Sequence, residues 1–541
     1  MLMIRQKIIK LIRKSIKNLQ KRKKLPQFKI PEIQIEHPEK RIYGDYSINI
    51  AMVMAKKIKE NPLKIAKFII SDFKFSISDF FEKVEVKEPG FINFFLSKKY
   101  LQKQIKELLK KGEKFGQLNI GKNKKINIEF ISANPTGQLH LGHGRGAFFG
   151  DCLAKVLEKA NYKIIRQYFI NDAKVNTQIK LLGQTALGKG ITYLNDYLKE
   201  KIKILEPKLQ KCKNEKEAGF LLAQEIQKDT KNFIEEKLKI KFNQWISEES
   251  LYQKNKINKI FQWLKNKDLV YQKENAWWLK TSKFGDSQDW VIVKKNGEPT
   301  YLLSDIAYHK DKFKKGFQKN INIWGADHQA HVSKIKAAIK MLGYKGELII
   351  LISQVVRLEK GKISKRKGEI ITLEDLIKEV GLDIARFLYL TKSLDSQMKF
   401  DLELAKEQSE KNPVYYIQYA YARINSILKK INSKLIQSKQ VLNPKFQNFK
   451  LLTHPSELEL IKELIRFPEI IEDTTKDYQV QRIPQYSLDL ATTFHQFYRN
   501  CRVLTGIRLS RSKARLGLVL ATKIVLKNIL DLMEISAPEK M

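Results

Sequence analysis

The sequence predicts a multidomain α/β protein, in which a parallel-sheet domain lies between an N-terminal α+β domain and a C-terminal all-α bundle. Residues 125–132 alternate apolar and polar side chains, and they are followed by a glycine-bearing turn, an amphipathic helix and an apolar strand over 164–170. This order is that of a βαβ unit and predicts a Rossmann-type sheet. Helix and strand patterns mix before residue 111, and apolar residues follow helical spacing after residue 373. The expected domains are therefore 1–111, 112–385 and 386–541.

The N-terminal domain begins with a basic amphipathic segment. No acidic residue occurs up to Lys29, and the apolar side chains between Ile4 and Ile16 follow helical spacing. Transit peptides carry similar charge, but this segment is poor in serine and alanine and has more lysine than arginine. We interpret it as the first helix of a folded domain, with organellar import as the less favoured alternative. A helix over 48–58, a strand over 89–96 and a Gly- and Lys-rich linker over 110–125 follow.

The middle of the chain interrupts the parallel-sheet pattern. Residues 190–285 are charged and mostly helical in spacing, which predicts a helical insertion. Strand patterns return at 290–293, 321–324 and 348–352, and these predict the second half of the sheet.

Composition excludes several classes of protein. Of the 541 residues, 43% are hydrophobic and 30% are charged, which indicates packed cores rather than extended disorder. No run approaches the ~18 consecutive apolar residues that a membrane-spanning helix needs. The three cysteines, Cys152, Cys212 and Cys501, are too scattered for a disulfide framework. We therefore expect a cytoplasmic protein without a membrane span.

The chain is strongly basic. Lysine and arginine number 102 against 58 acidic residues, for a formal net charge of +44. Such a field attracts polyanions, and nucleic acid is the foremost candidate. Lysine, isoleucine and asparagine are abundant together, as in proteins encoded by AT-rich genomes. Codon bias therefore explains much of the excess of lysine as well as a nucleic-acid partner does.

The first candidate site is His140-Leu141-Gly142-His143, between the first strand and helix of the βαβ unit. Two imidazoles three residues apart share one face of a helical turn. Free backbone N–H groups and the helix dipole favour a phosphate at this position, and Gly142 lets a flat ring approach the backbone. The alternative is a pair of helix-capping histidines.

The second candidate site is the basic segment 362–368, Lys-Ile-Ser-Lys-Arg-Lys-Gly. It follows the strand at 348–352 and precedes a helix that Thr372 and Asp375 are expected to cap. A lysine run alone is usually a solvated turn. Together with His140 and His143 on the same sheet, it predicts that two positive elements hold ATP during in-line attack on the α-phosphate.

These motifs carry a family resemblance. Residues 132–146, with His140 and His143, resemble the first signature of class I aminoacyl-tRNA synthetases, and more narrowly that of arginyl-tRNA synthetases. Residues 362–366 resemble the second class I signature, KMSKS, with Ile363 in place of methionine. Further segments resemble the same family: Tyr168–Ala173, Pro299–Tyr308, Trp324–His328, Asn412–Ala420 and Ser536–Met541.

The resemblance implies an ATP-dependent ligase, aided by Mg²⁺, that joins L-arginine to the 3′-terminal adenosine of tRNA(Arg), with arginine activation usually requiring bound tRNA. It implies a Rossmann catalytic domain, an N-terminal domain that touches the tRNA elbow, and a helical anticodon-binding domain. We expect a monomer. The implied catalytic and ATP-binding residues are His140, Gly142, His143, Lys362, Ser364 and Lys365. The implied arginine-binding residues are Glu129, Asn134, Tyr301, Asp305, Asp327 and Gln329, and the implied tRNA-binding residues are Tyr416, Tyr419, Met541, Tyr46 and Asn49.

Alternatives stay open for single residues and for the function. Asp305 also suits a helix N-cap, and Glu129 an outward-facing strand carboxylate. The other functions considered are a different class I synthetase, such as one for cysteine, a nucleotidylyltransferase, and a non-catalytic RNA-binding paralogue. No Cys-x-x-Cys pair occurs, so we expect no structural zinc, and we expect Mg²⁺ to be held through ATP phosphates.

Overall fold

A computed structural model describes residues 3–73, 79–360, 371–407, 409, 411–432, 448–504 and 509–541. Its centre is a five-stranded parallel sheet in the order β12-β11-β5-β6-β7. The strands are β5 (Lys125–Glu129), β6 (Lys163–Ile170), β7 (Gln244–Ser247), β11 (Lys319–Gly325) and β12 (Glu347–Ser353). The chain starts in the central strand β5, adds β6 and β7 on one side, and then adds β11 and β12 on the other. This arrangement confirms the predicted Rossmann-type domain.

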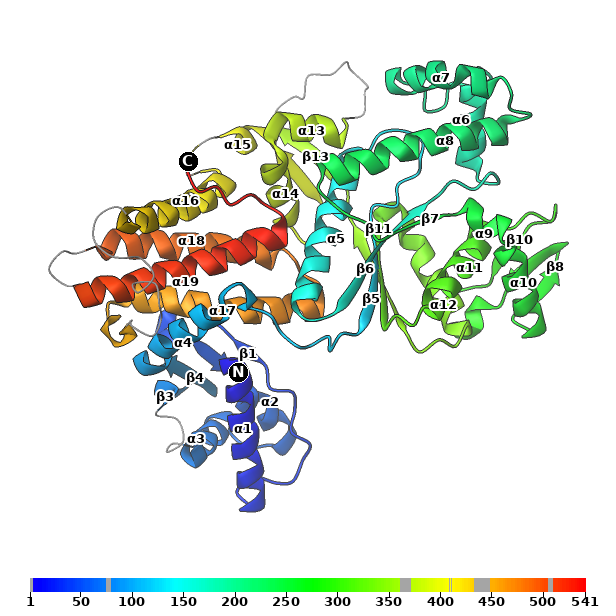
Figure 1. Cartoon of the computed structure of the whole chain (residues 1–541). Helices are drawn as coiled ribbons and strands as arrows, with labels where there is room; N and C mark the ends of the chain where they lie inside the picture. The colour runs from blue at the N-terminus through cyan, green and yellow to red at the C-terminus, as the bar shows by residue number, and fades with distance from the viewer. Residues whose placement is uncertain are drawn as a thin grey trace.

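Helices cover both faces of this sheet (Figure 1). Helix α5 (Leu141–Lys159) packs on one face, where Phe148 and Leu153 join Ile128 in the larger hydrophobic core. Helices α11 (Tyr301–Lys314) and α12 (Val332–Met341) cover the other face, where Leu303 and Ile335 belong to a second core. The apolar residues predicted on one side of α5 are all buried.

The insertion is less uniformly helical than predicted. Between β6 and β7 lie α6 (Thr177–Ala186), α7 (Asp196–Leu209), α8 (Glu215–Asn232) and the π-helical turn Phe233–Lys237. Helices α9 (Glu249–Gln253) and α10 (Lys256–Asn266) follow β7, and then an antiparallel sheet of β8 (Val270–Lys273), β9 (Ala276–Leu279) and β10 (Trp290–Val293). The helical prediction is wrong for β7, β8 and β9. Strand β7 has four residues, lies at the edge of the sheet and has only partly buried side chains. Its sequence therefore contains no apolar run that would indicate a strand.

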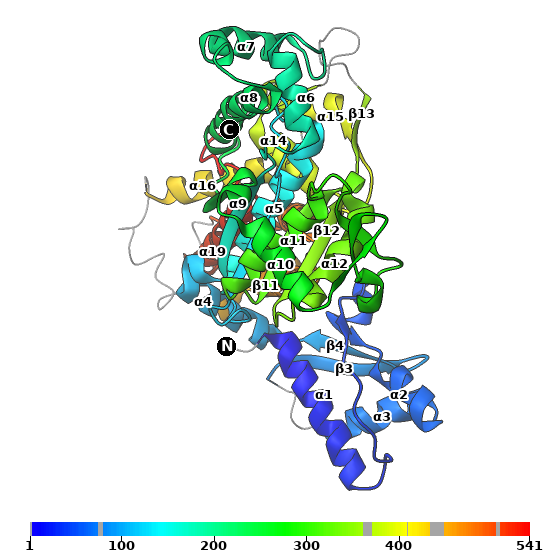
Figure 2. The ribbon, with the colours of Figure 1, turned by 90° about the vertical axis from the view of Figure 1, so that its right-hand side faces the viewer.

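The N-terminal domain is a separate lobe below the sheet domain (Figure 2). Its antiparallel sheet has the order β1-β2-β4-β3. The elements are α1 (Ile4–Lys21), β1 (Ile35–Glu36), β2 (Tyr46–Ile48), α2 (Ile50–Ile58), α3 (Pro62–Phe73), β3 (Phe81–Lys87), β4 (Phe91–Leu96) and α4 (Lys98–Lys111). This domain is fastened to α17 (Pro455–Asp477), because Arg5 pairs with Asp473 at 2.6 Å and His37 lies 2.9 Å from Glu469.

The C-terminal region is a helical bundle, as predicted (Figure 1). The bundle comprises α16 (Pro413–Asn432), α17, α18 (Arg482–Asn500) and α19 (Leu509–Met533). It is joined to the sheet domain through β13 (Val356–Lys360), α13 (Leu373–Val380), α14 (Leu382–Leu390), β14 (Met398–Asp401) and α15 (Leu402–Lys406). Strand β14 pairs with β13 in parallel inside a region predicted as helical. Among the described residues, no helix has the length and apolar character that crossing a bilayer requires.

Candidate active site

A cavity of about 760 Å³ opens at the carboxyl ends of β5, β11 and β12. Its wall is formed by the turn after β5, the first turn of α5, and the segments that follow β11 and β12; it includes Asn134, His140, Gly142, His143, Trp324, Asp327 and His328. Strand order reverses between β5 and β11, and ligands of open parallel sheets bind at such a switch point. Five of the predicted ATP- and arginine-site residues, His140, Gly142, His143, Asn134 and Asp327, are thus brought together.

The turn after β5 is strained and firmly held. Ile131 and Ser132 have φ values of +67° and +41°, which is costly for a β-branched residue such as isoleucine. Strand β6 stabilises this conformation, since the Phe169 N–H donates to Ser132 Oγ at 3.1 Å and the Asn171 amide donates to the Ser132 carbonyl at 3.1 Å. The turn therefore presents exposed Asn134 to the cavity in a fixed position.

The two histidines of the His-x-Gly-His motif form one unit. Their ring centroids lie 3.8 Å apart, the Gly142 N–H donates to His140 Nδ1 at 3.0 Å, and the His140 N–H donates to His143 Nδ1 at 3.1 Å. Burial lowers the pKa of His140, and burial with the His140 charge lowers the pKa of His143 to about 3. Both rings are therefore neutral at pH 7. Because each Nδ1 accepts a hydrogen bond, each Nε2 carries the proton and is free to donate.

The basic segment 361–370, with Lys362, Ser364 and Lys365, lies outside the described residues. The described residues before and after this segment contribute to the lining of the cavity. Arg357 and Leu358 of β13 line it on one side and Ile371 on the other. Thr372 forms a backbone bridge with His140, and the Leu373 N–H donates to the Leu139 carbonyl at 2.7 Å. The Thr372–Asp375 capping box is present as predicted.

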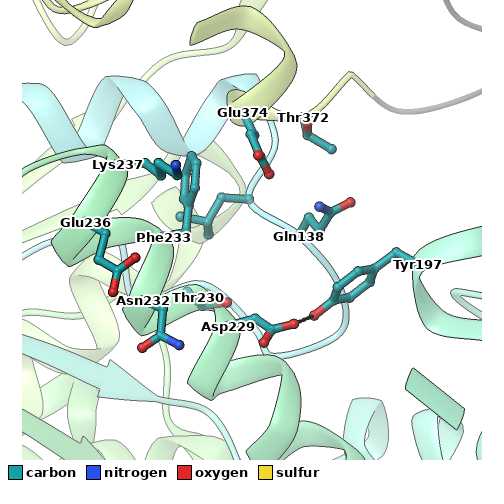
Figure 3. Close-up of a pocket in the computed structure, with 11 residues that line it drawn as sticks. Gln138, Tyr197, Asp229, Thr230, Asn232, Phe233, Glu236, Lys237, Thr372 and Glu374 are labelled. Carbon is teal, nitrogen blue, oxygen red and sulfur yellow. Dashed lines mark hydrogen bonds between the residues drawn. The ribbon is translucent and has the colours of Figure 1, made fainter. Parts of the chain in front are cut away.

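A second cavity of about 260 Å³ includes Thr372 of this bridge in its wall (Figure 3). Gln138, Thr372 and Glu374 form one wall, and helices α7 and α8 form the other. Tyr197 donates to Asp229 there at 2.9 Å, which fastens α7 to α8. None of the predicted site residues within the described ranges lines this cavity. The cavity lies between the insertion and the sheet domain, and it is separate from the predicted site.

Asp305 lies in a polar cluster beside the main cavity. Helix α11 begins at Tyr301, so the N-cap interpretation of Asp305 is wrong. His331 Nε2 lies 2.6 Å from Asp305 Oδ2, and the His331 ring contacts the exposed ring of Tyr301 and stacks on Trp324. Burial would raise the pKa of Asp305, but the bond from His331 and the neighbouring histidine charges lower it. Trp324 lines the main cavity and so joins the two groups.

Sequence reasoning missed Glu248. It follows β7 at the carboxyl edge of the sheet and is 7% exposed. Its Oε1 accepts from Ser304 Oγ at 3.0 Å, whereas its Oε2 is buried and has no partner among the described residues. Burial, with the charges of Asp305 and Asp172, raises its pKa to about 7. A polar pair, Ser247 and Glu248, at the carboxyl end of a strand would have indicated a site residue, but strand β7 itself was not predicted.

The remaining predicted arginine residues separate into two groups. Glu129 is 4% exposed and its carboxylate contacts Lys312 and Tyr308, so the interpretation of an outward strand carboxylate is wrong. Asp327 and Gln329 are exposed on the 3-10 turn Ala326–His331. Within the described ranges, no group of three or more His, Cys, Asp or Glu side chains lies close enough together to hold a metal ion.

Three of the predicted tRNA-binding residues gather on the bundle. Tyr416 and Tyr419 are half-buried on α16, and both rings contact His495. Met541 is 53% exposed at the end of a tail that runs along α16, where Lys429 pairs with Glu539 at 2.8 Å.

The two predicted tRNA-binding residues of the N-terminal domain differ in exposure. Tyr46 is 1% exposed and its hydroxyl donates to Glu469 at 3.0 Å. The prediction that Tyr46 contacts tRNA is wrong, because α17 covers this side chain. Asn49 is half-buried at the start of α2.

Comparisons with known proteins place these observations in a family. Three family models match: "Arginyl tRNA synthetase N terminal domain" over residues 6–96, "tRNA synthetases class I (R), catalytic domain" over 104–211 and 195–410, and "DALR anticodon binding domain" over 417–541. The chain is 41% identical to an arginine–tRNA ligase of Bacillus subtilis over 95% of each chain. It is 40% identical to one of Caldanaerobacter subterraneus, covering 95% of this chain and 94% of the relative.

Solved structures agree on the fold. The arginyl-tRNA synthetase of Plasmodium falciparum superposes with a TM-score of 0.80 at 22% identity, and that of Thermus thermophilus with 0.78 at 20%, each over the full length of both chains. The site geometry, the family models and the full-length relatives lead to one conclusion: this chain belongs to the arginyl-tRNA synthetase family of class I aminoacyl-tRNA synthetases.

Proposed function

We propose that this chain is an arginine–tRNA ligase that forms arginyl-adenylate and AMP. The observation that carries the proposal is the acidic pair of buried Glu248 and half-buried Asp305 beside a switch-point cavity that contains two Nε2–H imidazoles. A guanidinium is recognised by carboxylates in a planar fork, and a polyphosphate by fixed donors. Membership of the family supports both assignments.

Glu248 and Asp305 bind the guanidinium in this proposal. Glu248 offers its unpartnered Oε2, and Asp305 is fixed by His331. The exposed ring of Tyr301 covers the guanidinium plane, and a guanidinium stacks well on an aromatic face. Glu129, at the end of β5, adds a third carboxylate to the arginine pocket, and Asn134, held by the strained turn after β5, binds the α-amino or carboxylate end. Asp327 lines the cavity, and Gln329 lies on the same turn.

Adenylation is then an in-line displacement. An oxygen of the arginine carboxylate bonds to the α-phosphorus of ATP, and the bond from that phosphorus to the pyrophosphate oxygen breaks. No protein nucleophile is needed, so catalysis depends on orientation and on stabilisation of the charge that develops on phosphate oxygens. The Nε2–H groups of His140 and His143 donate from one side, and Lys362, Lys365 and Ser364 act from the other. Mg²⁺ accompanies ATP through its phosphates.

Transfer completes the reaction. A hydroxyl of the 3′-terminal adenosine of tRNA(Arg) bonds to the arginyl carbonyl carbon, loses its proton, and AMP leaves. Tyr416, Tyr419 and Met541 contact the anticodon loop, and Asn49 contacts the tRNA elbow. Helix α1 adds exposed cations that have no carboxylate partner among the described residues: Lys10, Arg13, Lys14, Lys17 and Lys21. Such a face suits the phosphates of an RNA arm.

Aminoacylation of total tRNA with each of the standard amino acids tests the proposal. We expect charging with arginine alone, and D305N should raise the KM for arginine while the KM for ATP changes by less than about twofold. Charging with another amino acid would keep the fold and overturn the guanidinium site. A wild-type protein that binds tRNA and charges nothing would overturn the proposed function.

A further inference from the structure

A buried lysine, Lys312, lies between two of the carboxylates that the proposed function uses. It is seven residues after Asp305 on α11, and its side chain is 1% exposed. Its ammonium contacts the Glu129 carboxylate at the end of β5 and donates to Asn322 Oδ1 on β11 at 2.9 Å. An ammonium removed from water is stable only when it is paired and hydrogen-bonded. The contacts with Glu129 and Asn322 therefore stabilise the buried Lys312 ammonium.

The same lysine ends a hydrogen-bond chain that begins at Asp305. His309 Nδ1 lies 2.9 Å from the Asp305 carbonyl and therefore donates to it. His309 Nε2 then accepts from the Asn322 amide at 2.9 Å, which leaves Asn322 Oδ1 to accept from Lys312. Burial and the Lys312 charge lower the pKa of His309 to about 4, so the ring is neutral as this chain requires. The chain connects the backbone of α11 at Asp305 with Glu129 across the sheet.

Glu129 is held by one of its two oxygens. Oε2 contacts Lys312 and accepts from the Tyr308 hydroxyl, whose oxygen lies 2.6 Å away. Among the described residues, none donates to Oε1. Glu129 also lies immediately before the segment that forms the strained turn at Ile131 and Ser132. Any shift of Glu129 would therefore reach the wall of the cavity.

From these contacts we infer that Lys312 is a positioning residue of the arginine site: it fixes the Glu129 carboxylate relative to Asp305. Lys312 touches no substrate in this account, and it acts through Glu129 and Asn322. The inference rests on the proposed function, because it assigns Glu129 and Asp305 to arginine.

The groups around Glu129 show why the lysine charge matters. From α11 it faces Lys312, the Tyr308 hydroxyl and neutral His309, and the neighbouring strands contribute the neutral amides of Asn322 and Gln167. Within the described residues, Lys312 is thus the cation that compensates Glu129. Without it, the Glu129 carboxylate would be buried with no cation to hold it, and its placement relative to Asp305 would be lost.

The test compares K312M, K312R and E129Q in aminoacylation. We expect K312M to raise the KM for arginine by at least about tenfold, because Glu129 loses the contact that fixes it. The KM for ATP should stay within about twofold of the wild-type value. K312R keeps the charge and should restore the KM for arginine to within a few-fold of the wild-type value, and E129Q should raise it as K312M does.

Three results would overturn the inference. One is an unchanged KM for arginine in K312M, and another is an equal rise of the KM values for arginine and ATP, which indicates a merely structural role. If K312M does not fold, the neutral pair E129Q/K312M establishes that the lost charge is responsible, and K312R then carries the test. An arginine KM in K312R that is raised about tenfold or more would be the third contrary result. Failure of the wild-type enzyme to charge arginine would instead overturn the proposed function.

Discussion

His331 Nε2 lies 2.6 Å from Asp305 Oδ2, and this contact joins Asp305 to the wall of the main cavity. The His331 ring stacks on Trp324 with a centroid separation of 5.7 Å, and Trp324 lines that cavity. One imidazole therefore fixes the Asp305 carboxylate and packs against the cavity wall. In the proposed function, this arrangement couples recognition of the arginine side chain to placement of its carboxylate.

The arginine affinity of the wild-type enzyme should increase with pH. The pKa of Glu248 is raised to about 7, so this carboxyl is largely protonated at pH 6 and ionised at pH 8. Guanidinium binds the ionised form, and the KM for arginine should therefore fall several-fold between pH 6 and 8, with release of a proton. E248Q should raise the KM and remove the slope. A flat wild-type profile would show that Glu248 does not face the substrate.

Glu248 should also destabilise the fold as the pH rises. Its folded-state pKa lies above the ordinary glutamate value near 4.3, so the native state binds the proton more tightly than the unfolded state and loses stability through the interval from about 4 to 7. E248Q should accordingly be more stable than wild type at pH 8, by about 1–3 kcal/mol. Urea unfolding at pH 5 and pH 8 measures the difference. A variant less stable at pH 8 would contradict the assignment.

The histidine pair should act as neutral donors. Alanine at His140 or His143 removes one fixed N–H from the phosphate, and loss of such a donor costs about 10²–10³ in rate. G142A should act in the same direction, because an added Cβ would lie 2.9 Å from His140 Cε1 and displace the ring. Single-turnover adenylation measures these rates, and tRNA affinity is the control. A wild-type rate that rises as imidazole protonates between pH 7 and 6 would contradict the neutral assignment.

The exposed cations of α1 should contribute to tRNA binding. We expect K10E/K14E/K17E to raise the KM for tRNA, to leave kcat at saturating tRNA unchanged, and to reduce the salt slope by up to about 2.7. A matched control, K254E/K259E/K267E, places the same charge change on exposed residues around α10, away from the N-terminal lobe. Equal effects of the two variants would show that net charge, and not this face, is responsible.

Arg386 should be essential for stability. Its guanidinium is 1% exposed, donates to Asp151 Oδ2 at 3.0 Å and to the Met533 carbonyl at 3.2 Å, and so joins α14 to α5 and to the end of α19. Because R386M leaves buried Asp151 with the longer contacts of Lys155 and Arg166, each at 3.8 Å, unfolding free energy should fall by up to about 3–5 kcal/mol. The neutral pair D151N/R386M should recover much of the loss. A single variant as stable as the double variant would contradict this account.

Local patterns explain what could be predicted from sequence. Strands β5, β6, β11 and β12 carry apolar runs, and the strand–turn–helix around His140 and His143 places both imidazoles without reference to distant residues. Lys312 was not predicted, because it lies among Lys310, Lys314 and Lys315, and nothing in the local sequence marks one of these four as buried. Glu248 follows a strand too short and too polar to be recognised. Both residues acquire their roles from elements distant in sequence.

Tyr46 illustrates the opposite error. The resemblance implied a tRNA contact for Tyr46, but its hydroxyl donates to Glu469 of α17 and the side chain is buried. The docking of one domain on another decided this exposure, and no local pattern reports it.

ATP–pyrophosphate exchange with each amino acid, measured with and without added tRNA, tests the central claim most directly. The account predicts exchange with arginine alone, dependent on tRNA, and in D305N a raised KM for arginine with a retained KM for ATP. Exchange with a different amino acid would contradict the assignment of Glu248 and Asp305 to a guanidinium. Absence of exchange with every amino acid, from a folded protein that binds tRNA, would contradict the proposed function itself.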